Sequence, residues 1–201
     1  MTETRVPPAR HAATYQDLLA APDHLVAEIL FGELVTHPRP ALRHARVTSR
    51  LNTVLGPPFD LGVGGPGGWV FLVEPELHLG GHVAVPDFAA WRRERLPAIP
   101  DTPWIDVAPD WVCEVLSPST EGYDRGEKRT IYAEAEVGHL WLADPRSRML
   151  EVFELNNAKW LLLDVFRDGA QVTAPPFAEL TFALGLLWPF DSEAADQGDA
   201  T

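Results

Sequence analysis

The sequence predicts a single α/β (α+β) domain, built on a mixed, mostly antiparallel sheet that is flanked by a few helices. Three observations support this fold class. The chain has 201 residues, of which 46% are hydrophobic and 22% charged, and this size and composition suit one buried core. Most apolar segments are short and are separated by glycine, proline or asparagine turn signals, as is typical of strands. Helical spacing is confined to a few segments.

The domain is expected to occupy residues 14–190. Residues 1–13 are predicted to be a loose leader without the apolar stretch of a signal peptide, and residues 191–201 an acidic, disordered tail. The longest apolar runs, Trp69–Val73 and Phe182–Trp188, are far shorter than the roughly 20 residues that span a bilayer. We therefore expect no association with a membrane.

Charge and cysteine content limit the location and the partners. The formal net charge of −13 argues against tight non-specific binding to a polyanion, but not against an enzyme that acts on nucleic acid through local arginines and a bound cation. The one cysteine, Cys113, cannot form a disulfide within the chain, which fits a reducing, cytoplasmic environment. The only lysines are Lys128 and Lys159, whereas every other basic position is arginine.

The first part of the chain predicts a helix, a hairpin and a second helix. Thr14 and Asp17 resemble a capping box for a short helix that ends before Pro22. The segments Leu25–Phe31 and Glu33–Val35 are predicted to pair as a hairpin. The next helix has an apolar face and an arginine-rich face, formed by His44, Val47, Thr48, Leu51 and Leu55 and by Arg43, Arg46 and Arg50.

The remaining chain predicts strands that are interrupted by one helix. The expected elements are the loop Gly56–Gly68, the strands Trp69–Leu79, His82–Trp91 and Trp111–Leu116, the helix from Ser119 or Thr120 to about Glu136, and the strands Leu140–Ala143, Met149–Leu155, Lys159–Phe166 and Gln171–Thr173. On the helix, Asp124, Lys128 and Tyr132 share one face because they are four residues apart.

Three acidic residues interrupt otherwise apolar predicted strands: Glu28, Asp87 and Glu114. Burying a carboxylate in such a strand costs several kcal/mol unless a cation or hydrogen bonds compensate it. A shared hard cation is the natural partner, because Mg²⁺ prefers a pair of carboxylates together with water. Zinc-ligand spacings, a GxSxG nucleophile motif and a phosphate-binding glycine loop are not found in the sequence.

Lys128 is the fourth candidate residue, on the helix that follows the strand of Glu114. A lysine beside a metal-activated water can orient that water or take its proton. The alternative is an i, i+4 salt bridge with Asp124, and the sequence alone does not decide between the two.

These candidates lie within short motifs spread over residues 14–165. The motifs are Glu28-Ile-Leu-Phe-Gly-Glu-Leu-Val35, His44 at the start of a helix, Pro86-Asp87, Glu114-Val-Leu-Ser-Pro-Ser-Thr120, Asp124-Arg-Gly-Glu-Lys128, Tyr132-Ala133 and Trp141-Leu-Ala-Asp-Pro145. This set closely resembles the Uma-two family of restriction endonuclease-like proteins, which belongs to the PD-(D/E)XK nuclease superfamily. The Glu-Val-Leu-Ser-Pro-Ser-Thr string with its downstream Asp and Lys is its most specific part.

The resemblance implies a restriction endonuclease-like core that hydrolyses DNA phosphodiester bonds with one or two metal ions. Asp87 and Glu114 would hold Mg²⁺ or Mn²⁺, the backbone carbonyl of Val115 would add a ligand, and Lys128 would assist the attacking water. Glu28 would be an accessory acid that steers the metal or the water. A homodimer would let two such sites address two DNA strands.

The sequence departs from the superfamily pattern at two positions. The usual lysine lies two residues after the second acid, where this chain has Leu116, so Lys128 takes that role only if the lysine has migrated to the helix. His139 stands where relatives tend to have an acidic residue.

Three functions therefore remain open. The first is a metal-dependent DNA endonuclease, and the second is a catalytically weak or silent nuclease-fold module that binds or regulates. The third is a small-molecule metal enzyme that uses Glu74, Glu76 and His78, although the solvated face of an antiparallel strand explains these residues as well. His44 is a further candidate, either for a phosphate contact or for a local hydrogen bond. Loss of metal binding in Asp87→Ala would separate the first function from the third.

Overall fold

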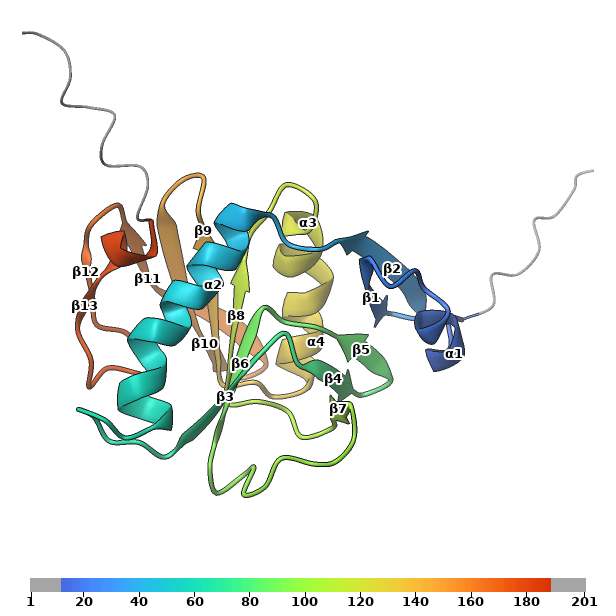
Figure 1. Cartoon of the computed structure of the whole chain (residues 1–201), viewed down its shortest axis with the longest axis horizontal. Helices are drawn as coiled ribbons and strands as arrows, with labels where there is room; N and C mark the ends of the chain where they lie inside the picture. Colours follow the sequence, from blue (N-terminus) through green and yellow to red (C-terminus); the bar gives the residue numbers. More distant parts are fainter. Residues whose placement is uncertain (1–11, 189–201) are drawn as a thin grey trace, which may run out of the picture.

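The computed structural model describes residues 12–188 as a mixed fold of helices and strands (Figure 1). Its helical elements are α1 (Tyr15–Leu19), α2 (Leu42–Leu55), η1 (Gly56–Asp60), α3 (Glu121–Tyr123), η2 (Asp124–Lys128), α4 (Arg129–Glu134) and η3 (Leu184–Leu187). Its strands are β1 (Leu25–Leu30), β2 (Glu33–Pro38), β3 (Trp69–Val73), β4 (Glu76–Leu79), β5 (His82–Ala84), β6 (Phe88–Arg92), β7 (Trp104–Ile105), β8 (Trp111–Val115), β9 (His139–Asp144), β10 (Met149–Asn156), β11 (Lys159–Arg167), β12 (Gln171–Val172) and β13 (Phe182–Ala183). The predicted leader, residues 1–13, and the predicted tail, residues 191–201, lie outside the described residues except for Ala12 and Ala13.

Within the described residues, the strands form two main sheets and one small pair. The larger sheet has the order β11-β10-β9-β8-β6-β3, and the smaller main sheet has the order β2-β1-β5-β4-β7. Neighbouring strands run antiparallel except for the parallel pairs β8–β9 and β4–β7. The predicted fold class, a mixed and mostly antiparallel sheet with few helices, is confirmed.

Helices cover both faces of the larger sheet, and β8 shows how the two faces are packed. One face packs against the buried side of α2 and includes Trp111, Cys113 and Val115. The other face packs against α4 and includes Val112 and Leu116. Because side chains alternate along a strand, Glu114 points to the same side as this second set. Its carboxylate is thereby directed toward the helical segment that carries Lys128.

Two of the predicted strands are each broken in the structure. The run Trp69–Leu79 forms β3 and β4, and the run His82–Trp91 forms β5 and β6, so each run contributes one strand to each main sheet. The first break begins at Glu74, which has a left-handed backbone with φ 49, and continues with a proline. The second break contains Pro86, which has no N–H to donate to a ladder. This break places Asp87 at the point where the chain passes from one sheet to the other.

The other predicted elements differ from the structure mainly at their ends. The capping box of Thr14 with Asp17 is confirmed at the start of α1, and β1 and β2 form the predicted hairpin. The loop that follows α2 begins with the π-helical turn η1, and the helix expected to reach Glu136 is divided into α3, η2 and α4. None of the helices in residues 12–188 is long and apolar enough to cross a membrane.

Candidate active site

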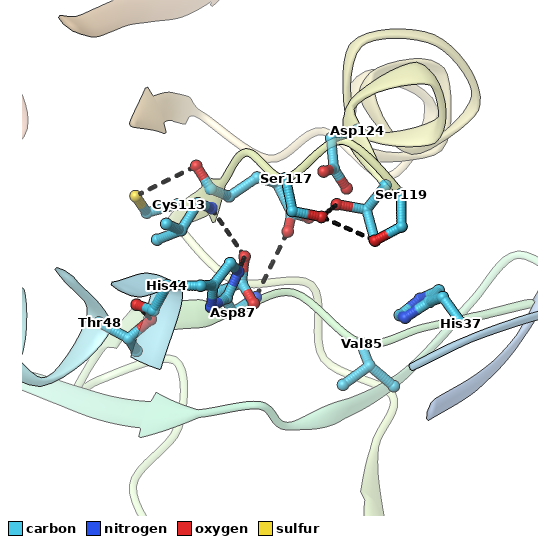
Figure 2. A network of polar contacts seen from close by, with 12 residues as sticks. His37, His44, Thr48, Val85, Asp87, Cys113, Ser117, Ser119 and Asp124 are labelled. Carbon is cyan, nitrogen blue, oxygen red and sulfur yellow. Dashed lines mark hydrogen bonds and ion pairs between the residues drawn. The ribbon is translucent and has the colours of Figure 1, made fainter. Parts of the chain in front are cut away.

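The four predicted site residues come from four segments and meet at one place. Glu28 lies on β1, Asp87 in the break between β5 and β6, Glu114 on β8 and Lys128 at the end of η2. Asp87, Glu114 and Lys128 line a pocket of about 200 Å³. Other residues that line this pocket, several of which are labelled in Figure 2, are His37, His44, Val85, Ser117, Ser119, Thr120 and Asp124.

Lys128 is buried, and oxygen atoms surround its ammonium group. The Nζ atom lies 2.9 Å from Oε1 of Glu114, 3.3 Å from Oε1 of Glu28 and 3.4 Å from Oδ1 of Asp124. It also donates a hydrogen bond of 3.1 Å to the carbonyl oxygen of Val85. Burial by itself lowers the pKa of Lys128, but the charges of Glu114 and Glu28 outweigh this effect and raise the pKa well above its usual value. The ammonium group is therefore protonated at neutral pH.

Glu114 is fully buried and receives its hydrogen bonds from two directions. The hydroxyl of Tyr132 donates to Oε1 over 2.5 Å, and the backbone N–H of Asp87 donates to Oε2 over 3.4 Å. Burial raises the pKa of Glu114 well above its usual value; Lys128 opposes this shift, and the charges of Asp124 and Asp87 add to it. The carboxylate thus lies where negative charge exceeds positive charge.

Glu28 is equally buried but is better compensated. The backbone N–H of Val85 donates to Oε1 over 2.7 Å, and Nε2 of His37 lies 2.9 Å from Oε2. Burial raises the pKa of Glu28, but the charge of Lys128 and the hydrogen bond from His37 bring it below the usual value. Glu28 therefore carries a negative charge that holds the ammonium group in place.

Asp87 is the most exposed of the four residues, with 15% of its side chain accessible. Its Oδ2 atom accepts a hydrogen bond of 2.7 Å from the backbone N–H of Val115 and lies 3.1 Å from Nε2 of His44 (Figure 2). Burial lowers the pKa of His44, but the hydrogen bond and charge of Asp87 raise it above its usual value. Both contacts hold the carboxylate of Asp87 through Oδ2. The other oxygen, Oδ1, accepts no hydrogen bond from residues 12–188.

The donor set of the pocket fits a hard divalent cation better than a zinc ion. The available atoms are carboxylate oxygens, namely Oδ1 of Asp87 and Oε2 of Glu114, whose one contact is a long hydrogen bond. Within the part of the chain that the structure describes, no three His, Cys, Asp or Glu side chains are grouped so that they could hold a metal ion together. Two carboxylates completed by water are the protein ligands typical of Mg²⁺.

Comparisons with known proteins identify the family of the chain and a similar fold. A family model described as "Putative restriction endonuclease" matches residues 12–186. The chain belongs to this family, Uma2. One solved structure, described as a putative nuclease belonging to DUF820 from Anabaena variabilis, has a similar fold with a TM-score of 0.68 at 23% sequence identity, over 88% of this chain and 98% of that chain. The sequences of curated proteins contain no match to the chain. The Uma2 family supports a nuclease function in general, with nucleic acid as the substrate class.

Two partners of the site in this Uma2 protein were not predicted. The hydroxyl of Tyr132 donates a hydrogen bond to Glu114, and Nε2 of His37 forms a hydrogen bond with Glu28. Tyr132 had a signal in the sequence, because it is one turn after Lys128. His37 lies two residues beyond the predicted second strand, Glu33–Val35, and joins the hairpin because β2 extends to Pro38.

The alternative cluster of Glu74, Glu76 and His78 does not form a cation site. Glu74 lies in the break after β3, whereas Glu76 and His78 lie on β4, where Nε2 of His78 is 2.8 Å from Oε1 of Glu76. Tyr15 donates a hydrogen bond to Glu76, and Trp104 stacks on the His78 ring. These contacts give Glu76 and His78 a structural role that joins α1, β4 and β7.

Proposed function

We propose that this protein is a metal-dependent endonuclease that hydrolyses DNA phosphodiester bonds. The observation that carries the proposal is the convergence of Asp87, Glu114 and Lys128, from three separate segments, on one small pocket in a fold of the nuclease type. Asp87 and Glu114 would hold Mg²⁺ or Mn²⁺, with the carbonyl of Val115 as a further ligand. When bound, the cation would polarise the phosphoryl oxygen and supply a hydroxide-like nucleophile near neutral pH.

The residues of the chain would position these groups. The contacts from Val115 N–H and His44 fix Asp87, and those from Tyr132 and Lys128 fix Glu114. Because Lys128 is held in its charged form, we propose that it orients the attacking water and offsets negative charge, and that it does not remove a proton. Glu28 would act as the accessory acid that keeps the ammonium group in the site.

A second candidate function is a catalytically silent module that keeps the nuclease fold for binding or regulation. The position of Lys128 favours it: its side chain is 4% exposed, and Glu114, Glu28 and Val85 already surround its ammonium group. To contact a water in the pocket, Lys128 must exchange one of these partners.

Cleavage of supercoiled plasmid in Mg²⁺ and in Mn²⁺ distinguishes the two functions. Wild type is expected to nick the plasmid, and Asp87→Asn, which preserves the shape of the side chain, is expected to abolish nicking. Glu127→Gln is the matched control, because Glu127 is an exposed acid on the same helical segment as Lys128. Equal behaviour of wild type and Asp87→Asn, with or without cleavage, would reject the endonuclease and favour the silent module.

We further propose that the protein is cytoplasmic and acts as a homodimer, so that two sites can address the two strands of DNA. The molar mass from light scattering after size-exclusion chromatography tests the dimer. A mass of one chain, 22.2 kDa, in the presence of cleavage activity would contradict it.

A further inference from the structure

Asp124 is a fourth buried carboxylate at the candidate site, and the roles proposed above leave it unused. It is the first residue of η2, is only 2% exposed, and lines the same pocket as Asp87 and Glu114. A carboxylate that is buried to this degree needs compensation, because its desolvation is costly.

The ion pair with Lys128 does not explain the burial of Asp124. A lysine ammonium group has three hydrogens to donate, and three acceptors lie closer to Nζ than Asp124 does: Glu114 at 2.9 Å, the Val85 carbonyl at 3.1 Å and Glu28 at 3.3 Å. Oδ1 of Asp124, at 3.4 Å, is the fourth and most distant acceptor.

The second oxygen of Asp124, Oδ2, is buried and has no hydrogen-bond partner. The neighbouring Thr120 hydroxyl favours the charged form of Asp124, but it makes no hydrogen bond of normal geometry with Oδ2. A buried carboxylate oxygen without a donor is uncommon in proteins and calls for an explanation, such as an ion or a water molecule. Asp124, which carries this oxygen, lines the pocket that Asp87 and Glu114 also line.

The charge of the site gives an independent indication of the missing partner. Glu28, Glu114 and Asp124 surround the ammonium group of Lys128, and Asp87 lies beside Glu114. These four carboxylates face one lysine and the imidazoles of His44 and His37, so acidic groups are in excess of basic groups. Burial and the charge of Asp87 raise the pKa of Asp124 although Lys128 lowers it, which reflects the same excess. A divalent cation would remove most of this excess.

We propose that Asp124 is the third carboxylate of the divalent-cation site, and that its free Oδ2 accepts a hydrogen bond from the hydration shell of the cation. This inference rests on the cation-binding part of the proposed function. Contact through water is the form that fits, since no three such side chains in residues 12–188 are grouped for direct ligation and Mg²⁺ retains several of its waters in proteins. Groups that act on a metal through such contacts typically contribute about 10- to 100-fold to metal affinity.

The test compares Asp124→Asn with Glu127→Gln in the full chain, without DNA, by Mn²⁺ titration calorimetry and by thermal unfolding. Asp124→Asn is expected to weaken Mn²⁺ binding about 10- to 100-fold relative to Glu127→Gln. Without metal, its melting temperature is expected to equal or exceed that of wild type, because the substitution removes excess negative charge. The rise in melting temperature on adding Mn²⁺ should shrink accordingly.

Each other outcome overturns a defined part of the reasoning. If Asp124→Asn binds Mn²⁺ as tightly as Glu127→Gln, or if it unfolds at a lower temperature than wild type without metal, Asp124 is only a structural partner of Lys128. Wild type that binds no Mn²⁺ would reject both this inference and the metal-dependent nuclease. Weakened Mn²⁺ binding in Asp124→Asn, combined with a wild type that cleaves no plasmid, would support this inference and reject only the nuclease.

Discussion

Replacing Lys128 with methionine tests the electrostatic description of the site most directly. Methionine preserves most of the apolar stem but removes the ammonium group, which lies within 3.4 Å of three carboxylates. Breaking a buried ion pair by removing one partner costs about 3–5 kcal/mol, because the remaining charge stays buried without compensation. We expect a loss of this size in the free energy of unfolding near neutral pH. In a chain of this length it corresponds to a fall of roughly 6–20 °C in melting temperature.

The loss should depend on pH with a predictable sign. The pKa of Lys128 lies above its usual value, so in wild type the stabilising charge is present throughout the acidic and neutral range and is lost only at strongly alkaline pH. In the variant, Glu114 and Asp124, whose pKa values are already raised, bind protons more readily, and protonation removes the repulsion between them. The difference between wild type and Lys128→Met should therefore be smaller at about pH 5 than at about pH 8.

Urea unfolding of both proteins at the two pH values measures this difference. Lys159→Met is the matched control, since Lys159 is the other lysine of the chain and is exposed at the start of β11; we expect it to change stability by less than about 0.5 kcal/mol. A loss below about 1 kcal/mol near pH 8, or a loss that is the same at both pH values, would refute the view that Lys128 is the compensating charge of a buried acidic cluster.

Two further predictions concern Glu28, which contacts the lysine, and Tyr132, which contacts Glu114. Glu28 has a lowered pKa in the folded protein, so its charge stabilises the fold above the usual glutamate pKa, and this contribution is lost as the pH falls through the pKa of the folded state. The difference in free energy of unfolding between wild type and Glu28→Gln, measured in urea, should therefore shrink on acidification. A difference that grows would contradict the lowered pKa of Glu28. Tyr132→Phe removes the hydroxyl that donates to Glu114 and should cost about 1–3 kcal/mol in the same assay, whereas an unchanged stability would show that Glu114 does not depend on this hydrogen bond.

The acids Glu28, Asp87 and Glu114 can be recognised in the sequence because each one interrupts an apolar segment. Glu28 and Glu114 lie on strands as predicted, and the helical spacing of Asp124, Lys128 and Tyr132 correctly places them on one face of a helical segment. The roles of these residues remain predictions, since they depend on the cation and the substrate.

The two broken strands could not be recognised from alternation alone. Apolar and polar residues continue to alternate through the break after β3, so the pattern of the run Trp69–Leu79 is that of one strand. The usable signal was a proline inside each run, Pro75 and Pro86, because proline does not fit the interior of a central strand. Which sheet each half joins depends on distant pairing, which local sequence does not specify.

The change of sheet at the second break makes the site sensitive to the mutual orientation of the two sheets. Glu28 and Val85, which hold Lys128 from one side, belong to the smaller main sheet and to the segment that leaves it, whereas Glu114 belongs to the larger sheet. The ion pairs and the hydrogen bond of the ammonium group thus link the two sheets at the pocket. A small rotation of the hairpin β1–β2 relative to β8 would change the spacing of the acids without altering any of them. Substitutions far from the pocket, at the contacts between the sheets, would therefore change the geometry of the proposed cation site.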